Sequence, residues 1–63
     1  MVKFDKSCRL HVTVLGFAKD IILLDDDDKE ALEDALNTES KWVQVGSLTI
    51  NTQYILSIDE RDR

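Results

Sequence analysis

The residues of this sequence that first point to chemistry are four consecutive aspartates, Asp25–Asp28. Carboxylate oxygens are the ligands that calcium and magnesium prefer in proteins. A calcium-binding loop that begins with the first of these aspartates needs glycine at its sixth position and an acid at its twelfth, but the sequence has Glu30 and Leu36 there. The run therefore does not match a calcium loop, and only a weak surface site for a hard cation, formed by Asp27 with Glu30 or Asp34, remains open. We expect no resident metal and no cofactor.

The four aspartates belong to a longer acidic segment. Residues 20–39 contain nine acids and one base, so this segment carries a charge of −8, whereas the rest of the chain carries +3. In one interpretation these side chains form the solvated start of a helix, where acids oppose the positive end of the helix dipole. In the other interpretation they imitate nucleic-acid phosphates and dock a basic channel on a host protein. The candidate interaction residues, which we call the acidic patch, are Asp25, Asp26, Asp27, Asp28, Glu30, Glu33 and Asp34.

Trp42 and Tyr54 are the second candidate interaction site. Large aromatic side chains on the surface of a sheet form an apolar area that a second copy of the chain or a protein partner can cover. Together with Lys41 they could also form a stacking platform for single-stranded nucleic acid. The net charge of −5 argues against nonspecific binding to phosphates, so nucleic-acid binding is the alternative and a protein partner is the leading hypothesis.

Cys8 and His11 are the remaining residues with reactive side chains. The single cysteine cannot form a disulfide within the chain. Residues three positions apart on a strand point to opposite faces, so these two residues do not form a thiolate pair, and we expect His11 to be exposed or at an interface. The sequence contains no glycine-rich phosphate loop, no nucleophile elbow and no zinc-binding spacing. A chain of 63 residues is also short for enclosing a ligand pocket of about 300 Å³. We therefore expect that the protein is not an enzyme.

The first half of the chain changes from a strand period to a helix period. Alternating apolar residues predict a strand over 9–15, and Gly16 separates it from the apolar run 21–24, which predicts a second strand in an antiparallel hairpin. Apolar residues at 31, 32, 35 and 36 then predict one amphipathic helix over 26–37. We expect Asp25 or Asp26 to cap its start and Asn37 to end it in a left-handed conformation.

The second half of the chain is predicted to contain three further strands, over 41–45, 48–50 and 54–58. Gly46 and Ser47 form a two-residue turn of the kind that closes tight hairpins, and residues 51–53 form a turn or a bulge. We expect residues 59–63 to be a frayed tail. The element order is ββαβββ, so the sequence predicts a small antiparallel sheet with one acidic amphipathic helix, an α+β fold in a single domain of residues 1–63.

Alternation leaves apolar side chains on both faces of the expected sheet. The face that the helix would cover carries Leu10, Val12, Val14, Val43, Val45, Leu48, Ile50, Leu56 and Ile58. The opposite face carries Leu15, Trp42, part of the run 21–24, and Tyr54 or Ile55. Because one short helix covers only one face, self-association would bury the other. We expect a homo-oligomer, with a dimer favoured.

Two further expectations concern where the protein acts. The apolar runs are shorter than the roughly 20 residues that span a bilayer. The first residues lack the pattern of a secretory signal. We therefore expect a cytoplasmic protein without a membrane partner.

The stretch 41–58 contains the pattern Trp42-x-x-Val45-Gly46, followed by Ile50-Asn51 and by Ile55-x-x-Ile58. This pattern resembles the ending of many short uncharacterised proteins of Gram-positive bacteria and their phages. The resemblance covers 18 of the 63 residues and assigns a function to none of them. It implies a small accessory protein of a phage or prophage, for which a host protein is the expected partner.

Overall fold

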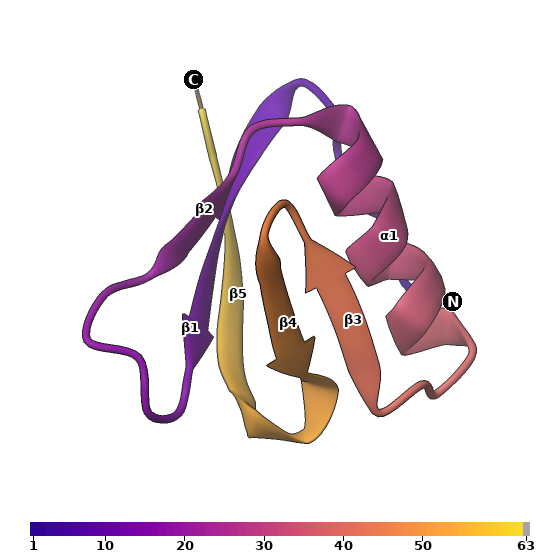
Figure 1. The fold of residues 1–63 in the computed structure, drawn as a ribbon. Helices are drawn as coiled ribbons and strands as arrows, with labels where there is room; N and C mark the ends of the chain where they lie inside the picture. Colours follow the sequence, from indigo (N-terminus) through magenta and orange to yellow (C-terminus); the bar gives the residue numbers. More distant parts are fainter. Residues whose placement is uncertain (63) are drawn as a thin grey trace.

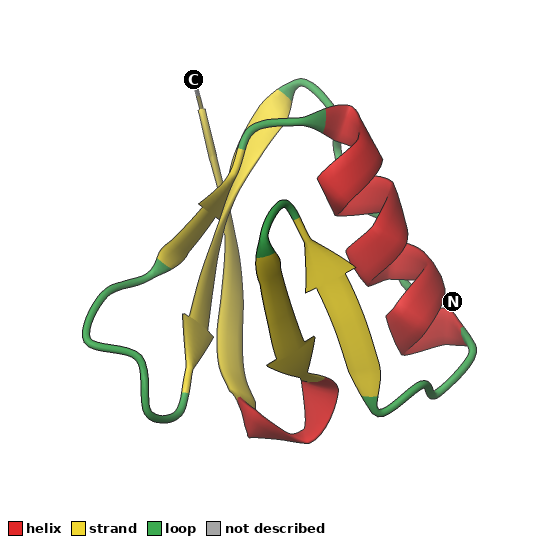
Figure 2. Cartoon of the chain, in the orientation of Figure 1, coloured by secondary structure: helices red, strands yellow, loops and turns green. Residues whose placement is uncertain are grey.

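The computed structural model describes residues 1–62. The element order is β1 (Cys8–Val14), β2 (Ile21–Leu23), α1 (Asp26–Asn37), β3 (Trp42–Val45), β4 (Leu48–Asn51), a short 3-10 turn η1 (Thr52–Tyr54) and β5 (Ile55–Asp62). One helix lies against antiparallel strands (Figures 1 and 2). The α+β class and the order ββαβββ are confirmed, and the helix has the bounds that its period predicts.

The five strands form two small sheets instead of one. A three-stranded sheet has the order β2-β1-β5, and a two-stranded sheet contains β3 and β4. The chain turns through η1 after β4, and β5 then pairs along β1 and not along β4. Leu10 of β1 pairs with Leu23 of β2 on one side and with Glu60 of β5 on the other. β1 is therefore the central strand of its sheet.

The expected frayed tail is wrong for residues 59–62. These residues continue β5, and its last pairs with β1 are Arg61 with Arg9 and Asp62 with Cys8. Residue 63 lies outside the described residues. The alternation of apolar side chains ends at Ile58, but backbone pairing needs only a neighbouring strand, and β1 supplies partners as far back as Cys8.

The core is one cluster of buried residues from α1 and both sheets. Its members are Leu10, Val12, Val14, Leu23, Leu32, Ala35, Val43, Val45 and Ile50. Two residues that the sequence placed inside are exposed, namely Leu48 at 40% and Leu56 at 64%. The β1–β5 register shifts so that Ser57 pairs with Thr13 and Ile55 pairs with Val14, which leaves Leu56 without a partner in β1. Such an extra residue changes the direction of the side chains on its strand.

Both ends of α1 are capped, but the C-terminal cap differs from the expectation. Asp25 is the N-cap, and its side chain accepts a hydrogen bond from the Asp27 backbone N–H at 2.9 Å. The left-handed residue is Glu39, with a φ of 57°, and not Asn37. The Ser40 backbone N–H then donates to the Ala35 carbonyl at 2.9 Å, the bond of a Schellman cap.

The β3–β4 hairpin is tied to the start of the helix. Its two-residue turn has Gly46 in the left-handed region with a φ of 59°. Glycine adopts this backbone conformation more easily than other residues do. The Gly46 backbone N–H donates to Asp28 Oδ1 at 3.1 Å. An aspartate of the acidic patch therefore orients the two-stranded sheet against α1.

Residues 2–6, which we call the strap, lie along α1 before the chain turns into β1. The N-terminus lies beside the C-terminal end of the helix (Figure 1). Phe4 is half-buried against the core cluster. The strap thus adds one apolar side chain to the core.

Candidate functional site

One end of the molecule, which we call the apolar end, carries most of the large exposed apolar side chains. Their exposed fractions lie between 44% and 64%, and the residues are Leu15, Phe17, Trp42, Tyr54 and Leu56. Surface patches of this kind mark interaction sites in soluble proteins more often than single exposed residues do. The apolar end is therefore the first candidate site.

Strand pairing brings these residues together from three segments. The Leu15 backbone N–H donates to the Tyr54 carbonyl at 2.8 Å, where β1 ends and β5 begins. Trp42 pairs with Asn51 in the β3–β4 hairpin, and the Thr52 backbone N–H donates to the Lys41 carbonyl at 2.7 Å. The start of β3 and the turn η1 consequently lie at the same end as the β1–β2 loop (Figure 1).

A shallow cavity opens at the same end, between the end of α1 and η1. Its volume is about 240 Å³, and it is lined by Ala35, Leu36, Glu39, Ser40, Lys41, Thr52 and Gln53. Two of the lining residues, Lys41 and Gln53, directly precede Trp42 and Tyr54 in the chain. The cavity is smaller than the roughly 300–1,000 Å³ of typical ligand pockets and has room for one inserted side chain.

Most carboxylates of the acidic patch have structural partners. Asp25 caps α1, and Asp28 accepts from Gly46. Glu33 Oε2 accepts a hydrogen bond from the Phe4 backbone N–H at 2.9 Å, and Glu30 Oε2 lies 3.4 Å from the Lys6 ammonium. These contacts favour the structural interpretation for four of the seven acidic residues.

The three other acids of the patch divide into two groups. Asp26 Oδ1 lies 3.5 Å from the ammonium of Lys29, a lysine that is completely buried. Asp27 and Asp34 are exposed, and within residues 1–62 their carboxylates have no hydrogen-bond or ion-pair partner. Asp27, Glu30 and Asp34 do not form a group of three potential metal ligands, and the one such group among residues 1–62 lies elsewhere.

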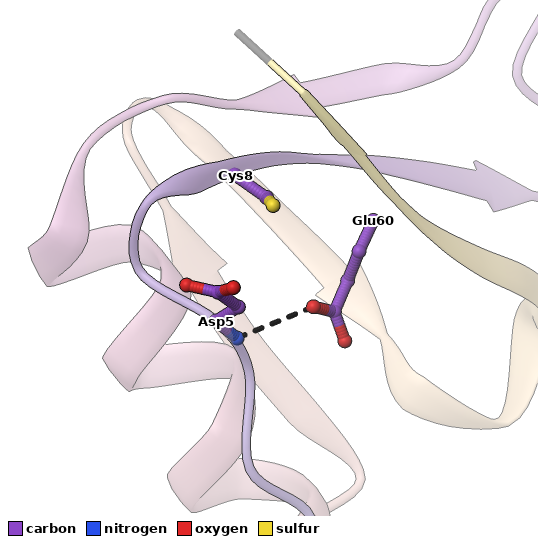
Figure 3. Close-up of side chains that lie close together, drawn as sticks. All are labelled: Asp5, Cys8 and Glu60. Atoms are coloured by element: carbon purple, nitrogen blue, oxygen red, sulfur yellow. Dashed lines mark hydrogen bonds between the residues drawn. The ribbon is translucent and has the colours of Figure 1, made fainter.

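That group consists of Asp5, Cys8 and Glu60 (Figure 3), whose ligand atoms lie within 4.8 Å of one another. Together with Asp62 and the Asp25–Asp28 run it forms what we call the acidic end, opposite the apolar end (Figure 1). One thiolate and two carboxylates are ligands that zinc accepts. Both carboxylates already receive hydrogen bonds, since the Asp5 backbone N–H donates to Glu60 at 3.3 Å and Ser7 donates to Asp5 Oδ1.

The pKa of Asp5 lies below its usual value. The largest cause is the hydrogen bond from the Ser7 hydroxyl, and the hydrogen bond from the Ser7 backbone N–H is the second. Contacts with Cys8 and the positive charge of Lys29 act in the same direction. The charged form of Asp5 therefore stabilises the turn between the strap and β1.

His11 is not exposed, contrary to one of the two expectations for this residue. Its exposed fraction is 8%, and Nδ1 lies 3.7 Å from Asp20 Oδ2. The Thr13 hydroxyl donates to Asp20 Oδ1 at 2.8 Å, which places Asp20 against this part of β1. Within residues 1–62, His11 Nε2 has no hydrogen-bond partner, and Cys8 lies with the acidic cluster instead of with His11.

The sequence identifies Trp42, Tyr54 and Leu15, which it places on one sheet face, but misses two other members of the apolar end. Phe17 falls between the two predicted strands of the first hairpin, and Leu56 is assigned to the core. The exposure of Leu56 follows from the shifted register between β1 and β5, in which this residue has no partner in β1. No local pattern of residues reports such a shift.

Comparison with known proteins finds no matching family model, no matching curated protein and no matching solved structure. Within residues 1–62, no helix is both long enough and apolar enough to cross a membrane.

Proposed function

We propose that this protein is a non-enzymatic interaction protein that docks a protein partner through its apolar end. The observation that carries this proposal is the gathering of Leu15, Phe17, Trp42, Tyr54 and Leu56 around one end with exposed fractions of 44–64%. Large aromatic side chains contribute most of the binding energy in many protein interfaces. The cavity beside Trp42 and Tyr54 offers a place for one side chain of the partner.

The partner that we propose is a host protein, and we propose that this protein acts in the cytoplasm. The pattern in residues 41–58 that resembles endings of short proteins from Gram-positive bacteria and their phages supports this choice. A second copy of the chain is the competing occupant, because a symmetric dimer would cover the same apolar surface. Light scattering after size-exclusion chromatography distinguishes the two, since only self-association doubles the mass at about 100 µM protein.

Affinity capture from the cytosol of a candidate host tests the proposal with paired baits. The double variant Trp42→Ser/Leu56→Ser removes two exposed side chains of the apolar end. The matched control Ile22→Ser/Leu24→Ser removes two side chains from β2 and the residue after it, which are 50% and 57% exposed. We expect a protein that the wild type and the control retain and the apolar-end variant loses. Equal capture by all three baits contradicts the proposal.

Binding of single-stranded nucleic acid is a second candidate function. Lys41, Trp42 and Tyr54 are all exposed at the apolar end, whereas the start of α1, which carries the Asp25–Asp28 run, lies at the opposite end of the molecule (Figure 1). Base stacking on such side chains quenches tryptophan fluorescence and is worth about 1–3 kcal/mol per base. Quenching of Trp42 by oligonucleotides that weakens in Lys41→Gln and at high salt would support this function over a protein partner.

A further inference from the structure

Four hydrogen bonds join the backbone of the strap to side chains of α1. Val2 makes two hydrogen bonds with the Asn37 side chain: its N–H donates to Oδ1 at 2.6 Å, and its carbonyl accepts from Nδ2 at 2.9 Å. The Phe4 N–H donates to Glu33 Oε2 at 2.9 Å. The Lys6 carbonyl accepts from the ammonium of Lys29 at 3.0 Å. Three helix side chains therefore bind the backbone of every second strap residue.

The spacing of these contacts matches two regular repeats. Lys29, Glu33 and Asn37 are four residues apart and form one stripe of the helix, with a rise of about 6 Å per step. Two residues of an extended chain advance by about 6.6 Å. A helix stripe with this spacing can therefore bind an extended segment over several residues, and we call these three residues the strap-binding stripe.

Hydrogen bonds to the backbone do not depend on the side chains of the bound segment, so the stripe itself is tolerant of sequence. Two strap side chains add selectivity. Phe4 packs against the core cluster, and the Lys6 ammonium lies 3.4 Å from Glu30. Because residues 20–39 carry a charge of −8, the surroundings favour a basic segment with one aromatic anchor.

Lys29 adds a requirement for an occupant. Its side chain is completely buried, and its ammonium has the Lys6 carbonyl and the Asp26 carboxylate as partners. A buried ammonium without enough acceptors is strongly destabilising, so the position of the Lys6 carbonyl needs an acceptor. An exchanged segment satisfies Lys29 as well as the strap does, whereas an empty stripe does not.

We propose that the strap-binding stripe is a recognition site for an extended, basic segment of a partner protein, with an aromatic residue in the place of Phe4. The strap occupies this site within the chain, and the partner segment replaces it. The mode resembles the addition of a strand to a sheet edge, where backbone hydrogen bonds supply affinity and one or two side chains supply selectivity. The residues of this site differ from those of the apolar end, so either proposal can fail alone.

A peptide titration tests the proposal. The probe is an end-blocked synthetic peptide with the sequence of residues 2–6, and the receptor is the full chain with Phe4→Ser, which weakens the strap. We expect saturable binding below about 1 mM, observed as shifts of the Asn37 side-chain amide signals. The same peptide with serine for phenylalanine, or with glutamate for both lysines, binds more weakly. Adding Asn37→Ala to the receptor removes two hydrogen bonds and weakens binding about tenfold.

Two results overturn the proposal. One is a folded Phe4→Ser chain that does not bind the peptide. The other is a wild-type dimer that Phe4→Ser dissociates, because the occupant is then the strap of a second copy. If Phe4→Ser does not fold, amide exchange in the wild type decides. We expect the Val2 and Phe4 N–H groups to exchange through local opening, faster than those of Leu10 and Val12, and exchange only through global unfolding contradicts a replaceable strap.

Discussion

The two ends of this molecule use their side chains in opposite ways. At the acidic end, Asp25 and Asp28 accept hydrogen bonds from backbone N–H groups, and Asp5 accepts two from Ser7. At the apolar end, five large side chains remain 44–64% exposed. Most carboxylates of the acidic patch, the most conspicuous feature of the sequence, therefore make contacts that stabilise the fold. The less conspicuous apolar residues are the ones left for a partner.

The difference follows from how polar and apolar groups are satisfied in a small chain. A carboxylate gains a partner from any nearby N–H group, and helix starts and turns supply such groups without adding residues. An apolar side chain leaves water only when another layer covers it. With one helix of 12 residues, the chain covers the inner faces of its sheets and leaves the apolar end open.

The largest expected effect comes from replacing the buried Lys29 at the acidic end. Lys29→Ala leaves the Lys6 carbonyl without its donor and opens a cavity, so we expect the free energy of unfolding to fall by about 3 kcal/mol. Leu56→Ser at the apolar end should change it by less than about 0.5 kcal/mol. Urea denaturation of both variants measures this contrast. Lys29→Met, which keeps most of the volume, should recover part of the loss, and equal losses for Lys29→Ala and Leu56→Ser would contradict it.

The second effect compares two neighbouring aspartates. Asp25→Ala removes the N-cap of α1 and should destabilise the protein by about 1 kcal/mol. Asp27→Ala removes a carboxylate without a partner among residues 1–62 and should cost less than about 0.3 kcal/mol, since surface substitutions of this kind are nearly neutral. Thermal unfolding followed by circular dichroism gives both values. A larger loss for Asp27→Ala would mean that the aspartates act mainly through the helix dipole.

A third and smaller effect concerns the end of the helix beside the cavity. Glu39 has a φ of 57°, a conformation that glycine adopts without the steric cost that other residues bear. Glu39→Gly should therefore raise the free energy of unfolding by roughly 0.5–1 kcal/mol. Glu39→Ala serves as the control, because it removes the carboxylate but keeps the Cβ. If both variants gain equally, the charge of Glu39 and not its backbone conformation is the cause.

The smallest effect is a pH dependence at the acidic end. The pKa of Asp5 in the folded protein lies below its value of 3.8 in an unstructured chain. The stabilisation by charged Asp5 is therefore complete above that value and is lost as the pH falls through the lowered pKa. Asp5→Asn should flatten the decline of the melting temperature between pH 4 and the acid limit of folding. If the melting temperature of Asp5→Asn declines as steeply as that of the wild type, other carboxylates cause the decline.

The sequence predicts the elements of this fold better than their pairing. Helical spacing at residues 31–36 and the Gly46 turn depend on local periods and turn chemistry, and the structure confirms both elements. The extension of β5 to Asp62 depends on partners in β1, which is distant in the chain. The left-handed residue differs for a local reason, because the helix hydrogen bonds continue to the Thr38 N–H and the chain reverses only at Glu39.

The candidate sites follow the same division. Trp42 is at the start of β3 and Tyr54 is at the end of η1, and both lie in segments of mixed polar and apolar residues, so their exposure could be expected. That Leu56 joins them requires the register shift after Thr13. The structural partners of Glu33 and Lys29 are backbone groups of the strap, and an extended segment without a strand partner leaves no periodic signal in the sequence.

The chain enters and leaves this molecule at opposite ends. Val2 is held beside Asn37, at the end of the helix that also borders the cavity. Asp62 lies at the acidic end, next to Cys8. A protein immobilised through an attachment after residue 62 therefore turns its apolar end toward the solution. A fusion placed before Val2 puts its linker beside the apolar end and pulls on the contacts between the strap and α1. The choice of attachment point thus sets which face of the molecule an immobilised sample presents.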